Sequence, residues 1–73
     1  MNVGDLVREI RRGDLIKEAG IVIRIIHPRT SMPDYRTPTS VLVFYGTPQE
    51  DEGKLKNEVW YTKSELKVVS ESR

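Results

Sequence analysis

The chain has 73 residues, with 12 Lys and Arg against 11 Asp and Glu, a net charge of +1, no Cys and a single His. This balance argues against a dedicated, strongly basic nucleic-acid binder, and the lack of Cys excludes a disulfide scaffold and a Cys-based zinc site. A chain this short forms one domain, 1–73, with a small core and marginal stability. Docking onto a larger partner or onto a second copy is one way to gain stability.

The first segment indicates a strand followed by a loop. Apolar and charged residues mix without a helical period after a Gly-Asp turn signal, which favours a strand over about 5–10, with a short helix at 4–12 as the competing interpretation. The apolar residues of this strand fall on both faces, so a bulge is expected. Residues 11–17 are expected to form a loop in which Leu15 and Ile16 tuck beneath the core.

The central element is a strand over about 19–27, because five of the six residues 21–26 are β-branched. Gly20 just before them indicates a sharp turn or close backbone packing. Strict alternation predicts a core face made of Ile21, Ile23 and Ile25. A strongly bent strand buries both faces at different points, which would add Val22 and Ile26 to the core.

Residues 27–39 are expected to form a long loop. Their three prolines forbid a regular strand or helix, and long loops in small domains are usually functional or disordered. Met32 and Tyr35 favour a loop that folds against the rest of the domain.

The second half of the chain predicts three further strands. Residues 40–45 form a strand that is apolar on both faces, so one face serves the core and the other needs a loop or a partner to cover it. Residues 46–57 are expected to be a polar connection leading to a strand over 57–62. A tight turn or single 3₁₀ turn at 63–65 and a short strand at 66–70 complete the domain.

This order of elements predicts an all-β fold, a small five-stranded SH3-like barrel with a long loop at 27–39. Residues 3–26 also resemble the KOW-type barrels of bacterial transcription elongation factors and some ribosomal proteins. The resembling residues are Gly4-Asp5-Leu6-Val7, Gly13 and Lys17-Glu18-Ala19-Gly20-Ile21-Val22-Ile23.

The whole chain resembles the short stand-alone SH3-like proteins of tailed phages. The shared residues are Val3-Gly4-Asp5-Leu6-Val7, Gly20-Ile21-Val22, Trp60 and Leu66-Lys67-Val68-Val69. This resemblance implies a non-enzymatic accessory, virion or adaptor protein that docks on another protein, and the family brings no catalytic motif. The loop at 27–39 and the acidic connection depart from the family's shorter loops, and a particular function is expected to lie there.

The residues themselves indicate no catalytic or cofactor site. His27 is the only imidazole, and the chain has neither a nucleophile motif nor a Gly-rich phosphate loop. Glu50-Asp51-Glu52 offers oxygen ligands to a hard cation, but adjacent acids in a loop are typical of a solvated tip. We therefore predict a protein that is not an enzyme and that has no metal or cofactor.

A binding surface is the remaining candidate, because arginine and exposed aromatic side chains suit both phosphate contacts and protein hot spots. Trp60 and Tyr61 point to opposite faces of their strand, so one of them should lie outside the core. The opposing interpretation is that the aromatic residues pack inside and the arginines are only solvated. The predicted partner-binding residues are Arg11, Arg12, Arg29, Tyr35, Arg36, Trp60 and Tyr61.

Two functions follow from this surface. The first is a structural or adaptor protein of phage type that docks on another protein, either in the virion or on a host complex. The alternative is a KOW-like RNA- or DNA-binding domain, whose affinity would fall with salt and whose salt slope would flatten by about two when Arg11 and Arg12 become Ala. No secretory signal or membrane span is recognised, so a cytoplasmic location is expected, in host cytoplasm or the virion for a phage protein.

Overall fold

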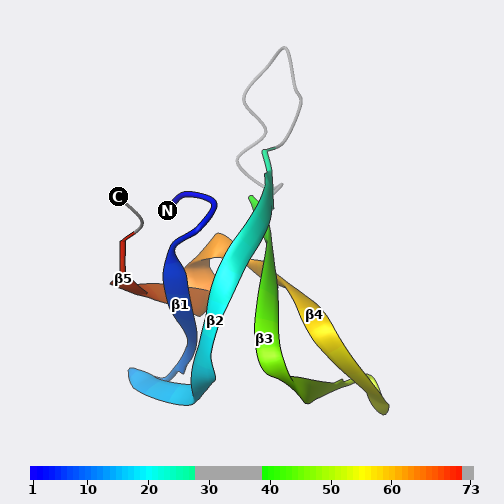
Figure 1. The fold of residues 1–73 in the computed structure, drawn as a ribbon. Coiled ribbons are helices and arrows are strands. Elements are labelled where there is room, and N and C mark those ends of the chain that lie inside the picture. Colours follow the sequence, from blue (N-terminus) through cyan, green and yellow to red (C-terminus); the bar gives the residue numbers. More distant parts are fainter. Residues whose placement is uncertain (28–38, 72–73) are drawn as a thin grey trace.

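The computed structural model describes residues 1–27 and 39–71, which form one antiparallel sheet of five strands (Figure 1). The strands run in the order β4-β3-β2-β1-β5 across the sheet. This confirms the predicted all-β, five-stranded fold, while the predicted loop, apart from its two end residues, lies outside the described residues. The elements are β1 (Leu6–Arg11), β2 (Asp14–Ile26), β3 (Ser40–Asp51), β4 (Lys54–Thr62), the 3₁₀ turn η1 (Lys63–Glu65) and β5 (Leu66–Ser70).

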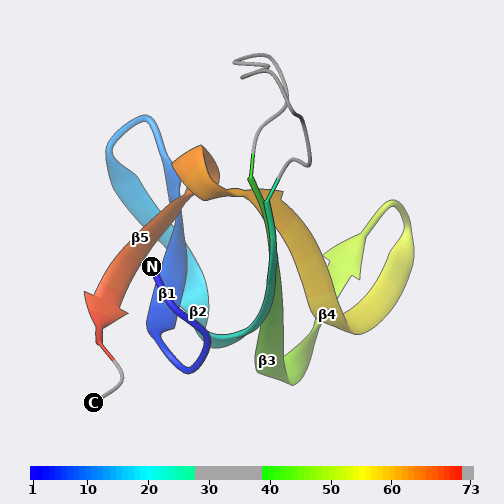
Figure 2. The same ribbon diagram turned by 90° about the horizontal axis from the view of Figure 1, so that it is seen from above.

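The sheet is curved but not closed. Figure 2 shows the strands curling around a shared interior, and β4 and β5 are the two edges of the sheet, with no backbone pairing between them in the described part of the chain. The predicted closed barrel is therefore not confirmed. The curvature follows from β-bulges, since the register shifts between Val7 and Glu9 on β1 and between Val22 and Arg24 on β2.

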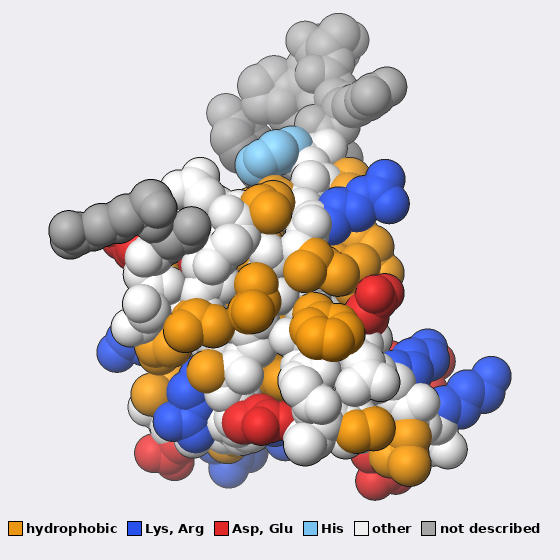
Figure 3. Space-filling view, in the orientation of Figure 1, with side chains coloured by type: hydrophobic (Ala, Val, Ile, Leu, Met, Phe, Trp, Pro, Cys, Tyr) orange, Lys and Arg blue, Asp and Glu red, His pale blue; other side chains and the backbone are white. Residues whose placement is uncertain are grey.

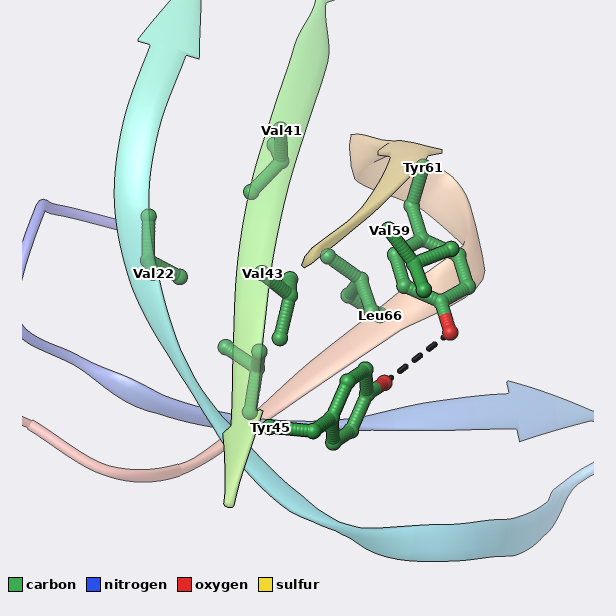
Figure 4. Close-up of a cluster of buried hydrophobic side chains, with 8 residues drawn as sticks. Val22, Val41, Val43, Tyr45, Val59, Tyr61 and Leu66 are labelled. Carbon is green, nitrogen blue, oxygen red and sulfur yellow. Dashed lines mark hydrogen bonds between the residues drawn. The ribbon is translucent and has the colours of Figure 1, made fainter. Parts of the chain in front are cut away.

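The core lies on the inner side of this curve and draws on all five strands (Figure 4). On β3 the alternation of the backbone turns Val41, Val43 and Tyr45 inward, as the apolar run at 40–45 predicts for one face. The buried apolar side chains are Val7, Val22, Val41, Val43, Tyr45, Val59, Tyr61 and Leu66.

The predicted core face of the central strand is wrong for two of its three residues. Val22 is fully buried, whereas Ile21 and Ile23 are exposed and Ile25 is only partly buried against the core. The bulge between Val22 and Arg24 explains the difference, because one extra residue changes the phase of the alternation along the strand. Ile26 is exposed as well.

Both hairpins are tighter than the sequence predicts. The predicted loop at 11–17 is a two-residue turn at Arg12-Gly13, and β2 already begins at Asp14. The predicted connection at 46–57 is paired strand as far as Asp51 and Lys54, with a turn at Glu52-Gly53. All four turn residues have positive φ, between 51° and 84°, which is the geometry of type I′ hairpin turns.

The long β1–β2 hairpin also corrects the expectation for Leu15 and Ile16. Both are strand residues rather than loop residues beneath the core, and Leu15 is exposed. Three residues of β2, Lys17 to Ala19, oppose Arg8 alone in the irregular register. The Arg8 Nε donates a hydrogen bond to the Lys17 carbonyl oxygen at 2.8 Å, which fixes this wide bulge.

Gly20 lies where β2 packs closely against β3. A Cβ added there would overlap the Val43 Cγ1 and would lie 2.9 Å from the Phe44 carbonyl oxygen and 3.0 Å from the Tyr45 ring. The close backbone packing predicted for Gly20 is thus confirmed. Only a residue without a side chain lets β2 pair this closely with β3 while Tyr45 turns into the core.

Candidate protein-docking surface

The outer face of the sheet carries exposed apolar side chains. Because Val41, Val43 and Tyr45 point inward, Leu42 and Phe44 must point outward. We define the apolar patch as Ile21, Ile23, Leu42, Phe44 and Trp60. Four of these side chains expose between 39% and 47% of their surface, and Leu42 is partly buried.

The strand register makes the apolar patch continuous. Ile21 on β2 lies directly opposite Phe44 on β3, and Leu42 on β3 lies opposite Trp60 on β4. Phe44 and Leu42 are two residues apart on one strand, so their side chains are neighbours on the same face. Figure 3 shows hydrophobic side chains gathered across the middle of this face. An uncovered cluster of this kind marks an interaction surface more often than scattered single residues do.

Opposite charges flank the apolar patch. Arg24 on β2 lies opposite Leu42, and Glu58 on β4 lies opposite Phe44. Both side chains are exposed, and neither makes a hydrogen bond or ion pair with another described residue. Beside Glu58, the residues Lys56 and Asn57 line a shallow, open depression. The patch is therefore an apolar centre with a polar rim, as in protein interfaces.

The two aromatic candidates from the sequence separate as expected, one on each face. Trp60 is exposed on the outer face of the edge strand β4, where it belongs to the apolar patch. Tyr61 is 6% exposed and packs in the core, so its assignment to a partner-binding surface is wrong. The physical reason is the alternation of β4, on which Val59 and Tyr61 share the inner side.

The predicted basic residues do not gather around the apolar patch. Arg11 donates a hydrogen bond at 3.2 Å to Glu9, and Arg12 lies in the hairpin turn without a partner among the described residues. Arg11 lies five positions along extended β1 from Leu6, which pairs with Ile21 at the patch margin, a distance of roughly 16 Å. Arg29, Tyr35 and Arg36 lie outside the described residues.

A polar cluster that was not predicted from the sequence lies on the inner side of the sheet and consists of Glu9, Lys17, Tyr45 and Tyr61. The hydroxyl oxygens of Tyr45 and Tyr61 are 2.9 Å apart, and the Lys17 Nζ lies 3.3 Å from the Tyr61 hydroxyl and 3.5 Å from a carboxylate oxygen of Glu9. Glu9 is itself buried. The alternation of side chains along β1 could have predicted the burial of Glu9, because Glu9 lies two residues from Val7 and so shares its inward face.

Burial governs the acid–base behaviour of these tyrosines. Desolvation raises the pKa of the Tyr61 hydroxyl above its usual value, and the hydrogen bond to Tyr45 and the nearby charge of Glu9 raise it further. Desolvation also raises the pKa of Tyr45, although its hydrogen bond with Tyr61 offsets part of that effect. Both phenols therefore stay protonated at neutral pH, and the cluster acts as a hydrogen-bonded support for the core.

Comparison with known proteins adds no relative. No protein-family model, no curated protein and no solved structure matches the chain.

Within residues 1–27 and 39–71, no three His, Cys, Asp or Glu side chains come together as ligands for a metal ion. None of the helical residues in the described ranges forms a segment long and apolar enough to cross a membrane.

Proposed function

We propose that this protein is a non-enzymatic docking module that binds a protein surface through its apolar patch. The supporting observation is the pairing of Ile21 with Phe44 and of Leu42 with Trp60 on a face that no described segment covers. Binding hot spots are enriched in tryptophan, and Trp60 is the most exposed side chain of this apolar area with a polar rim. The resemblance to phage SH3-like proteins suggests a virion or accessory role for such a module.

Nucleic-acid binding is the less favoured function, because both arginines of β1 have partners within the chain. Arg8 is bonded to the backbone of β2, and Arg11 is paired with the buried Glu9. Arg12 and Arg24, which have no partner among the described residues, leave too little charge to release many counterions. Base stacking on the exposed Trp60 would also place the nucleic acid beside Glu58, whose charge repels phosphate.

A Trp60→Ala substitution is expected to remove most of the affinity for the partner. Loss of a central tryptophan in an interface typically costs about 2 kcal/mol or more, which is roughly a thirtyfold weaker complex. The tagged wild-type chain is used to capture proteins from its native source, and each captured protein is then purified and titrated against wild type and variant by calorimetry. Leu55→Ala is the matched control, because Leu55 is 74% exposed but lies near the β3–β4 turn, away from the patch.

Support for the proposal is a direct complex that survives nuclease, weakens in the Trp60→Ala variant and persists in the Leu55→Ala variant. Binding that disappears after nuclease treatment, or that is equally strong in both variants, would contradict it. Circular dichroism of each variant confirms that the sheet is intact before the affinities are compared.

A further inference from the structure

The apolar patch and its two flanking charges form a self-complementary surface, on which a second copy of the same surface can pack. On the outer face, Ile21 and Trp60 lie at opposite ends of a diagonal, with Phe44 and Leu42 between them on β3. Arg24 and Glu58 lie at the ends of the other diagonal. Two strand spacings across and two residues along the strand place these two Cα atoms roughly 12 Å apart, with their midpoint on β3 between Leu42 and Phe44.

A half-turn about the apolar diagonal exchanges the two flanks. It lays Ile21 and Trp60 of one copy over the same residues of another and Phe44 over Leu42, and it brings Arg24 of each copy over Glu58 of the other. The strands of the two sheets then cross at a steep angle, close to the orthogonal mode of sheet packing. A patch that matches its own image in this way meets the requirement for a two-fold interface.

We propose that a second copy of this chain docks on the apolar patch, face to face, with two reciprocal Arg24–Glu58 ion pairs closing the flanks. This inference rests on the proposed function and names the partner of the same face. Arg24 and Glu58 have no ion-pair partner within the described part of their own chain, so the second copy satisfies both charges. A net charge of +1 per chain opposes the approach of two copies very little.

The size of the patch sets the expected strength of the dimer. Four half-exposed apolar residues, the partly buried Leu42 and their rim form an interface at the small end of the known range, on the order of 1,000 Å² in total, where transient complexes are found. The dimer is therefore expected to dissociate in the micromolar range. Trp60 is the single tryptophan of the chain, so its fluorescence reports directly on burial of the patch.

Charge reversal tests the orientation as well as the existence of the dimer. Sedimentation equilibrium and the Trp60 emission wavelength are measured from about 1 to about 500 µM for wild type, Arg24→Glu, Glu58→Arg and the double reversal. Each single reversal places like charges across both flanks and is expected to weaken the dimer about tenfold or more. The double reversal restores opposite charges and should return the dissociation constant to within about threefold of wild type.

The controls are charge reversals far from the patch. Arg12→Glu changes the net charge by the same amount as Arg24→Glu, and Glu52→Arg matches Glu58→Arg, but both lie in the hairpin turns. These controls should dimerise like wild type. Equal weakening by the controls, or a double reversal that stays monomeric, would overturn the arrangement.

A wild-type chain that remains monomeric at the highest concentration overturns this inference. If another protein still binds in a Trp60-dependent way, the docking function stands and only the choice of partner is wrong. If neither a dimer nor such a protein is found, both proposals fail.

Discussion

Raising the pH above about 10 is expected to lower the free energy of unfolding steeply, because two buried phenols must keep their protons in the folded state. Tyr45 and Tyr61 have raised pKa values when folded, whereas their ordinary value of 10.0 applies in the unfolded chain. Below pH 10 both states bind these protons, so the stability from the pair is fully present. Above it the unfolded chain releases them first, and each phenol then costs about 1.4 kcal/mol of stability per pH unit.

The measurement is a series of urea unfolding curves between about pH 8 and pH 12, repeated for the Tyr45→Phe/Tyr61→Phe double variant. The double variant keeps both rings in the core but has no phenol to titrate, so its stability should fall less steeply over the same range. Lysines titrate in both proteins, which makes the difference between the two curves the informative quantity. Parallel curves would show that the buried hydroxyls do not control alkaline stability.

Replacing Gly20 by Ala is expected to destabilise the protein by about 1–3 kcal/mol, the range found for overpacked cores. The added methyl overlaps the Val43 side chain, which has room to rotate only by disturbing the core. It also lies 2.9 Å from the Phe44 carbonyl oxygen, which is backbone in the middle of a strand pair and has little freedom to move. In a domain of this size that loss is a large share of the total stability.

Gly46→Ala is the matched control for this substitution. A Cβ at Gly46 meets nothing within 4 Å, and the residue also lies on a β3 segment next to the core. Alanine there is expected to leave stability unchanged or to raise it slightly by restricting the unfolded chain. Thermal unfolding of the two variants side by side separates crowding from the general effect of removing a glycine. Equal losses in both variants would refute the close approach at Gly20.

The sequence predicted those parts of the fold that depend on the residues within a few positions of one another along the chain. The strand over 40–45, the turn at 63–65 and the final strand were predictable, because β-branched composition and turn residues act over a few positions. The length of the two hairpins was not, because paired polar strands such as 49–51 resemble a loop in composition. The signal for them was the Glu52-Gly53 and Arg12-Gly13 pairs, which suit a two-residue turn.

The apolar patch was predictable from the sequence on β3 but not on β2. Leu42 and Phe44 had to face outward once the neighbours that alternate with them were assigned to the core. Ile21 and Ile23 were assigned to the interior because a bulge, which reverses the alternation, leaves no mark in composition. The positions of Arg24 and Glu58 across the patch depend on strand register, which the sequence alone does not set.

The open sheet leaves two edge strands whose free backbone groups would accept a further strand. Both edge strands carry lysines with exposed side chains. These are Lys54 and Lys56 on β4 and Lys67 on β5. Adding a strand at either edge would bring these ammonium groups together along a growing ladder and strip them of water. Fibre-like growth is thereby discouraged, and contact through the broad side of the sheet is the association that the molecule leaves open.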